Sequence, residues 1–378
     1  MTKPQQQFLE LLRSGLWGKP ADASIFQGEI DWKTILRLAK EQTVQVLVAN
    51  GIETLPKELW PPKVVIFKLM EVRTKTAKMH LLLNSVLAKI TAALNAEGIP
   101  SVLLKGQGLA QNYLIPESRI CGDIDLYVGE ENFDKAADII ATFSNDKRKP
   151  KEGLTGKEKH TEINVEGVTI EVHRRALSTF SSKQKQLLKE WTKKNLDSHF
   201  FDNTLPTIDF NQLPVNIPNA NFNAVFILYH AAYHMQIGGI GLRQICDWAT
   251  YLTKHHTEIN PEELKTILQR FHLTPVWKEF SIFAVNVLDL NPQCIPLIPK
   301  NLVSQKATDF ILNDIFETGN FGHYKRRQPT NCIMLRKLHS FLTLTKRFTR
   351  LTKLFPTFAL PTVISLYEKI FKRVFKST

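Results

Sequence analysis

The stretch that decides the fold runs from Leu103 to Val128 and reads L-L-K-G-Q-G-L-A-Q-N-Y-L-I-P-E-S-R-I-C-G-D-I-D-L-Y-V. Its last six residues alternate polar and apolar side chains, which predicts a strand. Side chains two apart on a strand point to one face, so Asp123 and Asp125 share a face opposite the apolar residues. Adjacent carboxylates repel each other unless a cation lies between them, and Mg²⁺ prefers such oxygen ligands, shared with phosphate. The stretch therefore predicts a divalent-metal site.

A pair of acidic residues at this spacing is weak evidence by itself, because the chain has 36 acidic residues and most such pairs are solvated surface. The order of the surrounding features is more specific. An apolar strand over 101–104 leads into Lys105 and Gly106, and a short helix is expected over 106–113. Glycine allows the backbone to approach phosphate closely, and N–H groups at a helix start favour anions. Lys105 would bind phosphate as a point charge or be a solvated lysine at a strand end.

A second alternating segment, over 168–172, is expected to pair with 161–165 through a two-residue turn at 166–167. On this second strand Glu171 and His173 share a face. His173 would contact an acceptor, contact the metal site, or hydrogen-bond to Glu171, and these alternatives stay open.

Together these motifs resemble the nucleotidyltransferase superfamily with the DNA polymerase β-like fold, and above all its branch of uncharacterised bacterial nucleotidyltransferases. That branch carries K-G, a tyrosine, R-x-x-x-D-I-D followed by a hydrophobic residue, and then I-E-x-H. The matching residues are Lys105, Gly106, Tyr113, Arg119, Asp123, Asp125, Glu171 and His173. Many superfamily members have Gly-Ser or Gly-Gly where this chain has Gly106-Gln107. The motifs cover about residues 103–175, and a looser likeness runs from the N-terminus to about residue 255.

The resemblance implies transfer of a nucleoside monophosphate from an NTP to an unidentified acceptor hydroxyl, dependent on Mg²⁺ or Mn²⁺. The acceptor would be a small molecule, a saccharide, a peptide or a protein. The implied catalytic and metal-binding residues are Asp123, Asp125 and Glu171. The implied nucleotide-binding residues are Lys105, Gly106, Arg119 and Arg243, and the candidates for the acceptor or the cleft are His173, His234 and Asp247. The competing hypothesis is a catalytically inactive binding protein of the same fold, which Gln107 favours and the three carboxylates oppose.

Arg119 would contact phosphate or pair with one of the two aspartates. Arg243 and Asp247 are four residues apart, so they would form an ion pair on a helix, or Asp247 would orient Arg243 toward the triphosphate. His230 and His234 also share a helix face. Because no glutamate or third ligand accompanies these histidines, packing or a cleft-lining role is favoured over metal binding.

Composition indicates a folded protein with room for two domains, since 43% of its 378 residues are hydrophobic and 22% are charged. Four widely spaced cysteines without a C-x-x-C motif favour a reducing cytoplasm over a disulfide framework or a zinc site. The polar N-terminus lacks the apolar core of a signal peptide, and no apolar run reaches the ~18 residues of a membrane span. We therefore expect a cytoplasmic protein, with peripheral contact at the inner membrane face as an open alternative.

The predicted fold class is α+β, with a small mixed-sheet domain between helical regions. The expected divisions are an N-terminal helical region at 1–98, a nucleotidyltransferase domain at 99–216, a helical domain at 217–322 and a basic aromatic segment at 323–378. Other expected elements are a helix capped by Asp31, a long helix over 63–97, an exposed loop over 144–160, and extended pieces around Phe200 and Ile208.

The charge of the chain lies almost entirely in the segment 323–378. This segment holds thirteen Lys or Arg and one acid, so it carries +12 of the net charge of +13. The basic residues alternate with aromatic ones, here Phe355, Phe358, Phe371 and Phe375. The segment would bind an RNA backbone, lie on an anionic membrane, or be a solvated face of a packed helix. Pro356 and Pro361 are expected to prevent one continuous helix here.

Overall fold

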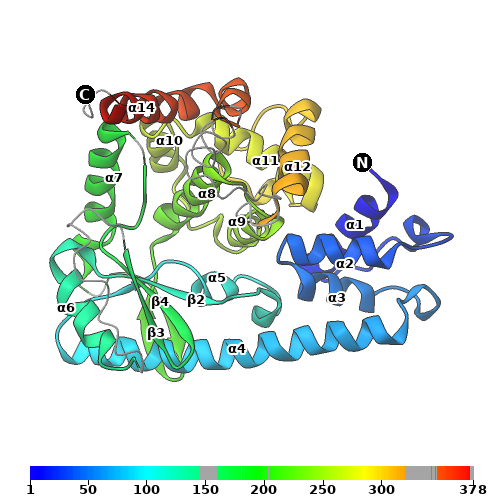
Figure 1. The fold of residues 1–378 in the computed structure, drawn as a ribbon, viewed down its shortest axis with the longest axis horizontal. Coiled ribbons are helices and arrows are strands. Elements are labelled where there is room, and N and C mark those ends of the chain that lie inside the picture. The colour runs from blue at the N-terminus through cyan, green and yellow to red at the C-terminus, as the bar shows by residue number, and fades with distance from the viewer. Residues whose placement is uncertain are drawn as a thin grey trace.

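The computed structural model describes residues 1–144, 160–179, 181–202, 204–320, 342, 345 and 347–374. Most of the loop expected over 144–160 lies outside these residues. The α+β class is confirmed, because helices surround a single six-stranded mixed sheet (Figure 1). Among the described cysteines, Cys121, Cys246 and Cys294 are buried free thiols. Nowhere in the described residues is there a helix with the length and apolar content that crossing a membrane would require.

Three short helices pack against one another at the N-terminus: α1 (Lys3–Trp17), α2 (Trp32–Glu41) and α3 (Gln45–Glu53). Asp31 caps α2 as expected, since its carboxylate accepts a hydrogen bond from the Thr34 amide at 2.9 Å. Glycine lets α1 and α3 approach closely. A Cβ atom added at Gly15 would lie 1.8 Å from the Leu47 carbonyl oxygen.

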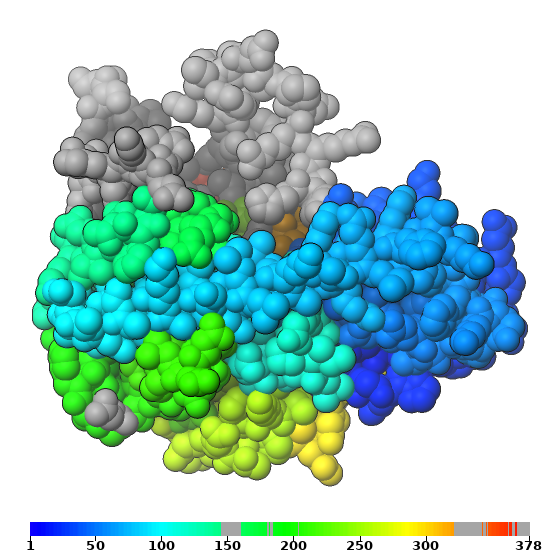
Figure 2. Space-filling model, turned by 90° about the horizontal axis from the view of Figure 1, so that it is seen from below, coloured from blue at the N-terminus to red at the C-terminus, as the bar shows by residue number. Residues whose placement is uncertain are grey.

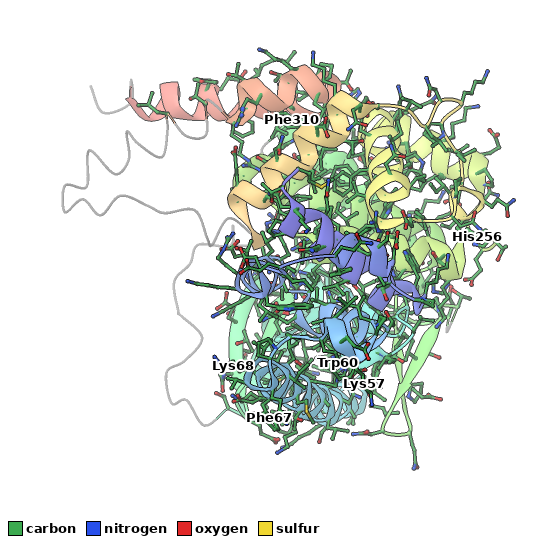
Figure 3. All side chains as sticks on the ribbon, turned by 90° about the vertical axis from the view of Figure 1, so that its right-hand side faces the viewer. Lys57, Trp60, Phe67, Lys68, His256 and Phe310 are labelled. Carbon is green, nitrogen blue, oxygen red and sulfur yellow. The ribbon has the colours of Figure 1, made fainter. Side chains whose placement is uncertain are left out.

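The long helix α4 (Lys63–Ala96) joins these helices to the sheet, and Figure 2 shows it crossing one whole face of the molecule. It ends where expected, with Gly98 at a φ of 66° that favours glycine. Its C-terminal half buries apolar residues against the sheet, while its N-terminal half leaves apolar side chains such as Phe67 exposed beside lysines such as Lys68 (Figure 3).

The sheet has the strand order β3-β4-β2-β1-β6-β5. Its strands are β1 (Val102–Leu103), β2 (Asp123–Tyr127), β3 (His160–Val165), β4 (Val168–His173), β5 (Thr207–Phe210) and β6 (Leu213–Asn216). The pairs β2–β4 and β1–β6 are parallel, and the other pairs are antiparallel. One face, with Ile124 and Ile170, packs against α4 and α6 (Gly129–Ala141), and the other carries the polar side chains of the motifs.

The local predictions within the sheet domain hold in most places. The β3–β4 turn has positive φ at both central residues, 54° at Glu166 and 86° at Gly167, as a tight two-residue hairpin requires. The helix expected over 106–113 is shorter, since α5 spans only Gln107–Ala110. A further helix, α7 (Ser182–Asn195), lies between β4 and β5.

The extended piece expected around Phe200 is wrong, whereas the one around Ile208 is confirmed as β5. A 3₁₀ turn over Asp197–His199 precedes Phe200. The turn is held because the Tyr127 hydroxyl donates to the Asp197 carboxylate at 2.7 Å. This contact joins residues 70 positions apart, so the local pattern could not reveal it.

The helical domain shares one apolar core with the N-terminal helices, although the two regions are distant in sequence. Its helices are α8 (Ala220–Ile237), α9 (Leu242–His255), α10 (Pro261–Arg270), α11 (Thr274–Leu288) and α12 (Gln305–Thr318). The buried amide of Gln42 links the two regions. It donates to the Ile315 carbonyl at 3.1 Å and accepts from the Leu242 amide at 3.0 Å.

The C-terminal segment is built into the helical domain more deeply than its charge suggested. Residues 347–354 are helical, and α14 (Pro356–Val374) follows after a break at Phe355. Pro356 therefore begins a new helix as expected, but Pro361 lies inside α14, so the prediction that it stops a helix is wrong. It removes one helical N–H, and the helix continues through it.

Several side chains expected on a charged surface are in fact buried. Phe355 and Phe358 are each 3% exposed and belong to the shared core. The buried Arg347 guanidinium binds the Asp314 carboxylate of α12 at 2.6 Å. The side chains of Phe371 and Phe375 lie outside the described residues. The aromatic residues 355 and 358 therefore stabilise the fold and do not form a binding surface.

Candidate active site

The three predicted carboxylates meet on the polar face of the sheet. Strand β2 pairs in parallel with β4, and the register places Asp125 opposite Glu171 and Asp123 opposite Thr169. Because side chains two apart share a face, Asp123, Asp125 and Glu171 all lie on the same side. Glu171, the third carboxylate that the resemblance implies, therefore lies on the strand next to Asp123 and Asp125.

Asp125 is the most buried of the three carboxylates, at 1% exposure. Its Oδ1 atom lies 2.8 Å from the Lys105 ammonium and 3.0 Å from His173 Nε2. Burial alone would raise the pKa of Asp125, but the Lys105 ammonium and the His173 hydrogen bond hold it well below its usual value. Asp125 is therefore a fixed negative charge at the centre of the site.

Asp123 and Glu171 differ in how their charge is compensated. Burial raises the pKa of Asp123, and repulsion from Asp125 raises it further. Within the described part of the chain, Asp123 forms no ion pair. Burial is the strongest influence on Glu171 and acts to raise its pKa, but the hydrogen bond from His173 at 3.1 Å and the nearby charge of Lys105 together lower the pKa. Asp123 is thus the carboxylate whose charge is least compensated, which suits a cation ligand.

The Lys105-Gly106 turn lies directly beside the carboxylate strand. Gly106 has a φ of 61° and a ψ of −118°, a conformation that L side chains rarely adopt, and a Cβ there would lie 3.1 Å from the Asp123 carbonyl oxygen. The Gln107 side chain is buried and contacts His80 and Asn84 of α4. The departure from Gly-Ser or Gly-Gly therefore places no bulky side chain toward the carboxylates.

Two hollows open beside the carboxylates. The first, of about 510 Å³, lies between the sheet and the helical domain and is lined by Lys105, Gly106, Leu109, Arg119, Asp123, Asp125, Phe226, Ile227, His230, Arg243, Gln244 and Asp247. The second, of about 740 Å³, is more open and is lined by Ile120, Cys121, Gly122, Asp123, Glu162, Thr169, Glu171 and Arg243. Asp123 and Arg243 line both hollows and therefore stand at their boundary.

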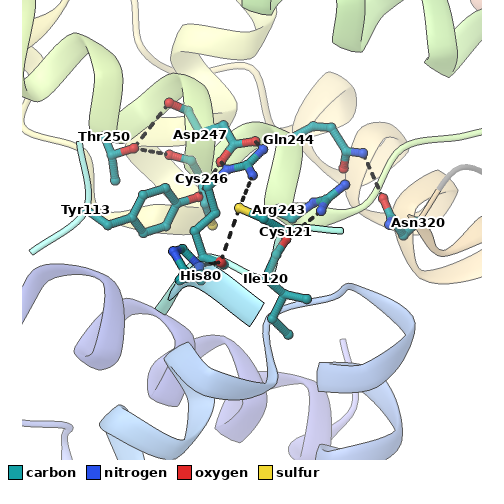
Figure 4. A network of polar contacts seen from close by, with 11 residues as sticks. His80, Tyr113, Ile120, Cys121, Arg243, Gln244, Cys246, Asp247, Thr250 and Asn320 are labelled. Atoms are coloured by element: carbon teal, nitrogen blue, oxygen red, sulfur yellow. Dashed lines mark hydrogen bonds and ion pairs between the residues drawn. The ribbon is translucent and has the colours of Figure 1, made fainter. Parts of the chain in front are cut away.

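Arg119 pairs with neither Asp123 nor Asp125, because its partner is Asp247. Its Nε and Nη2 atoms donate to the two oxygens of Asp247 at 2.7 and 2.8 Å. Figure 4 shows Asp247 together with Tyr113. The Tyr113 hydroxyl donates to the same carboxylate at 2.6 Å. These groups are all buried, so the pair joins the loop before β2 to α9. Arg119 still lines the first hollow, but its charge is matched inside the protein.

Arg243 is placed by a different contact from the one expected. Asp247, which we expected to pair with it or orient it, binds Arg119 instead. Arg243 Nη1 donates to the Ile120 carbonyl at 2.7 Å, again in Figure 4. This bond brings its guanidinium from α9 to the start of β2, where it lies close enough to Asp123 to lower that carboxyl's pKa against burial. Arg243 therefore remains a candidate for phosphate contact.

The two histidines of α8 contact each other, and one of them also contacts Lys105. His230 Nε2 is 3.4 Å from the Lys105 ammonium, and His234 Nε2 is 3.2 Å from His230 Nε2. His230 lines the first hollow, so the structure places His230, rather than the predicted His234, next to the candidate site.

His160 is the functional candidate that sequence reasoning missed, because it was assigned to a loop. It is the first residue of β3 and pairs with His173 across the hairpin. Its ring lies 5.0 Å from the His173 ring, measured between centroids. The alternation of polar and apolar residues over 161–165, extended by one residue toward the N-terminus, would have found it.

Comparison with known proteins agrees with this geometry. Neither the comparison with curated proteins nor that with solved structures gave a match. Residues 28–287, more than half of the chain, match the family model described as uncharacterised nucleotidyltransferase. The matched range includes the sheet, the Lys105-Gly106 turn, all three carboxylates, and helices α8 and α9. The chain therefore belongs to the uncharacterised nucleotidyltransferase family.

Proposed function

We propose that the protein transfers a nucleoside monophosphate from an NTP to an acceptor hydroxyl in a reaction that depends on a divalent metal. The acceptor oxygen forms a bond to the α-phosphorus, the bond from that phosphorus to the β-phosphate oxygen breaks, and pyrophosphate leaves. The hydroxyl proton passes to a base. The observation that carries the proposal is the parallel register of β2 and β4, which puts Glu171 beside Asp125, the residue that contacts Lys105.

The carboxylates fit a divalent metal. Asp123, Asp125 and Glu171 would hold Mg²⁺ or Mn²⁺, because such ions take carboxylate oxygens and share the remaining positions with phosphate. The poorly compensated charge of Asp123, shown by its raised pKa, supports this assignment. When bound, such ions neutralise the triphosphate and lower the pKa of the attacking hydroxyl.

The first hollow suits the triphosphate. Lys105 is a cation whose side chain is 19% exposed, and at Gly106 the backbone can approach a phosphate without a side chain in the way. Since Lys105 Nζ lies only 2.8 Å from Asp125, a phosphate drawn to the carboxylates through a metal would meet this ammonium as well. Arg243 would contact the phosphates from the opposite wall. The competing hypothesis of an inactive binding protein loses its main support, because the Gln107 side chain contacts α4.

The second hollow suits the acceptor. Glu171 lines it, whereas Lys105 and Gly106 line the first hollow. Glu171 would accept the hydroxyl proton there, and His173 would hold its carboxylate in place through the 3.1 Å contact. The hollow is open to solvent, which suits the hydroxyl of a saccharide, peptide or protein as well as that of a small molecule.

Replacing Glu171 by Gln is expected to preserve NTP binding and to lower transfer by about 10²–10⁴-fold, the usual contribution of a general base. Each labelled NTP, incubated with Mg²⁺ or Mn²⁺ and a cell extract, measures transfer, and equilibrium binding of the NTP is measured separately. Glu162→Gln is the matched control, because Glu162 lines the same hollow from β3. A Glu171→Gln protein with a lower melting temperature and unchanged activity per folded molecule would remove Glu171 from the chemistry.

We also propose that exposed cations of the C-terminal segment hold the enzyme at an anionic partner, a membrane surface at the inner face or an RNA. Arg350 and Lys353 are exposed there, unlike the buried Arg347. Each cation near an anionic lipid surface contributes about 1 kcal/mol. Arg350→Gln with Lys353→Gln is therefore expected to weaken sedimentation with anionic liposomes, or salt-sensitive RNA retention, by about tenfold or more.

The control for this prediction removes two charges elsewhere. Lys57 and Lys68 are exposed at the opposite side of the molecule, near α4 (Figure 3). Lys57→Gln with Lys68→Gln is expected to leave the association unchanged. An equal loss in both double variants would show a diffuse charge effect, and full-length protein that associates with neither partner at low salt would overturn the proposal.

A further inference from the structure

A second group of metal-ligand side chains lies at the acceptor side of the carboxylates. Strands β3 and β4 are antiparallel, and their register pairs His160 with His173 and Glu162 with Glu171. One donor atom each of His160, Glu171 and His173 lies within 4.8 Å of the others. Glu171 Oε2 is 3.1 Å from His173 Nε2 and 3.9 Å from His160 Nε2.

These distances between the ligand atoms fit three residues that bind one and the same ion. Zn²⁺ binds imidazole nitrogen and carboxylate oxygen at about 2.0–2.2 Å, so ligand atoms around it lie about 3–4 Å from one another. The site also has a further oxygen in reach, since Asp125 Oδ1 is 3.0 Å from His173 Nε2. The group is thus continuous with the carboxylate pair of β2.

His173 is placed for this site rather than for packing of the sheet. Its side chain is 1% exposed, and its Nε2 atom points at both Asp125 and Glu171. Its Nδ1 atom is buried and has no hydrogen-bond partner among the described residues. To ligate an ion, Nε2 would give up these two hydrogen bonds and carry no proton, and the proton of the neutral ring would then be on Nδ1.

The donor set selects a class of ion. Imidazole nitrogen suits Zn²⁺ and other first-row transition metals, whereas Mg²⁺ prefers oxygen ligands alone. Asp123 and Asp125 both line the first hollow and offer oxygen ligands, whereas His160 and His173 add nitrogen beside Glu171. The two ion positions of one centre would therefore differ in chemistry.

We propose that His160, Glu171 and His173 form a transition-metal site that binds Zn²⁺ or Mn²⁺ through two imidazoles and one carboxylate, beside the Asp123–Asp125 pair. The site rests on the proposed function only through Glu171, which both share. Of its three residues, Glu171 lines the second hollow, so the ion would lie on the acceptor side of the centre. The expected metal preference is Mn²⁺ or Zn²⁺ at this position and Mg²⁺ at the triphosphate.

The test uses the full-length protein with Mn²⁺ alone and no nucleotide. Electron spin-echo envelope modulation of the bound Mn²⁺ is expected to show ¹⁴N coupling from imidazole. His160→Ala is expected to weaken Zn²⁺ binding by about tenfold or more in calorimetric titration and to reduce the ¹⁴N signal, and His160→Gln is expected to do the same. His256→Ala is the control, because this half-buried histidine lies on the helical domain, away from the sheet (Figure 3). Circular dichroism checks that each variant is folded.

Absence of ¹⁴N modulation in the wild-type protein, or equal Zn²⁺ affinity in wild type and both His160 variants, overturns the proposal. The proposed function is tested separately by Mg²⁺-dependent NTP binding. A protein that binds Mg²⁺–NTP through Asp123 but shows no imidazole coupling keeps the function and loses this site. One that shows imidazole coupling but binds no NTP keeps the site and loses the function.

Discussion

Asp123→Asn is expected to abolish metal-dependent NTP binding, with at least a hundredfold loss of affinity, and to leave the melting temperature no lower than that of the wild type. Asp123 lines both hollows, and its carboxylate would be a ligand of the metal that the triphosphate shares. Its folded-state pKa is raised, chiefly by burial, so the ionised form is less favourable in the folded than in the unfolded chain. Removing the charge therefore removes a cost to folding at neutral pH.

Calorimetric titration of NTP with and without Mg²⁺ measures the affinity, and thermal unfolding followed by circular dichroism measures the melting temperature. Asp209→Asn is the matched control, because Asp209 is an exposed aspartate on β5 at the far edge of the same sheet. If Asp123→Asn and the wild type bind Mg²⁺–NTP equally, the assignment of the D-I-D strand as the metal site is wrong.

The double variant Asp123→Asn with Asp125→Asn should also lose NTP binding, but here we expect a loss of stability in addition. Asp125 is the buried partner of Lys105, and breaking a buried ion pair from one side costs about 3–5 kcal/mol. The pKa of Lys105 is raised despite burial because Asp125 and then Asp123 stabilise its charge. The single Asp123 variant is therefore the cleaner test of metal binding.

Asp247→Ala is expected to lower the free energy of unfolding by about 3–5 kcal/mol, the largest stability effect that we predict for one side chain outside the carboxylate site. The substitution leaves the buried Arg119 guanidinium without both of its carboxylate hydrogen bonds and Tyr113 without its acceptor. Equilibrium unfolding in denaturant gives the value directly.

Two controls separate this effect from a general loss of charge. Asp247→Asn keeps one acceptor oxygen and should lose less stability than the alanine variant. Glu41→Ala breaks the exposed pair with Arg37 on α2, and such surface pairs contribute less than about 1 kcal/mol. An Asp247→Ala protein within about 1 kcal/mol of the wild type would show that the network does not hold the loop before β2 to α9.

The loss of Asp247 should also reach the active site in molecules that remain folded. Arg119, on the loop that leads into β2, is tied to α9 by Asp247, and Arg243 on that helix donates to the Ile120 carbonyl of the same loop. Loosening this connection would displace Arg243 from Asp123. We therefore expect weaker NTP binding in the folded fraction, and the Tyr113→Phe variant, which keeps the Arg119–Asp247 pair, should retain it.

The sequence alone determined features that depend on residues near one another in the chain. The alternation of Asp123 to Tyr127 predicted a strand and its two faces, because side-chain direction has a period of two in any strand. The Glu166-Gly167 hairpin and the end of α4 at Gly98 were predicted for similar reasons. Both depend on backbone conformations that few residue types adopt.

Tertiary structure alone decided which element meets which face. Arg119 and Asp247 are 128 residues apart, and the β3–β4 register that places His160 opposite His173 follows from the pairing of whole strands. The C-terminal segment shows the same dependence on distant contacts. Its charge predicted an exposed surface, but Phe355 and Phe358 are buried in the core. Periodicity reports which side of an element is apolar and not what covers it. The partner of a buried charge is set by packing between distant segments, and that packing has no local signature.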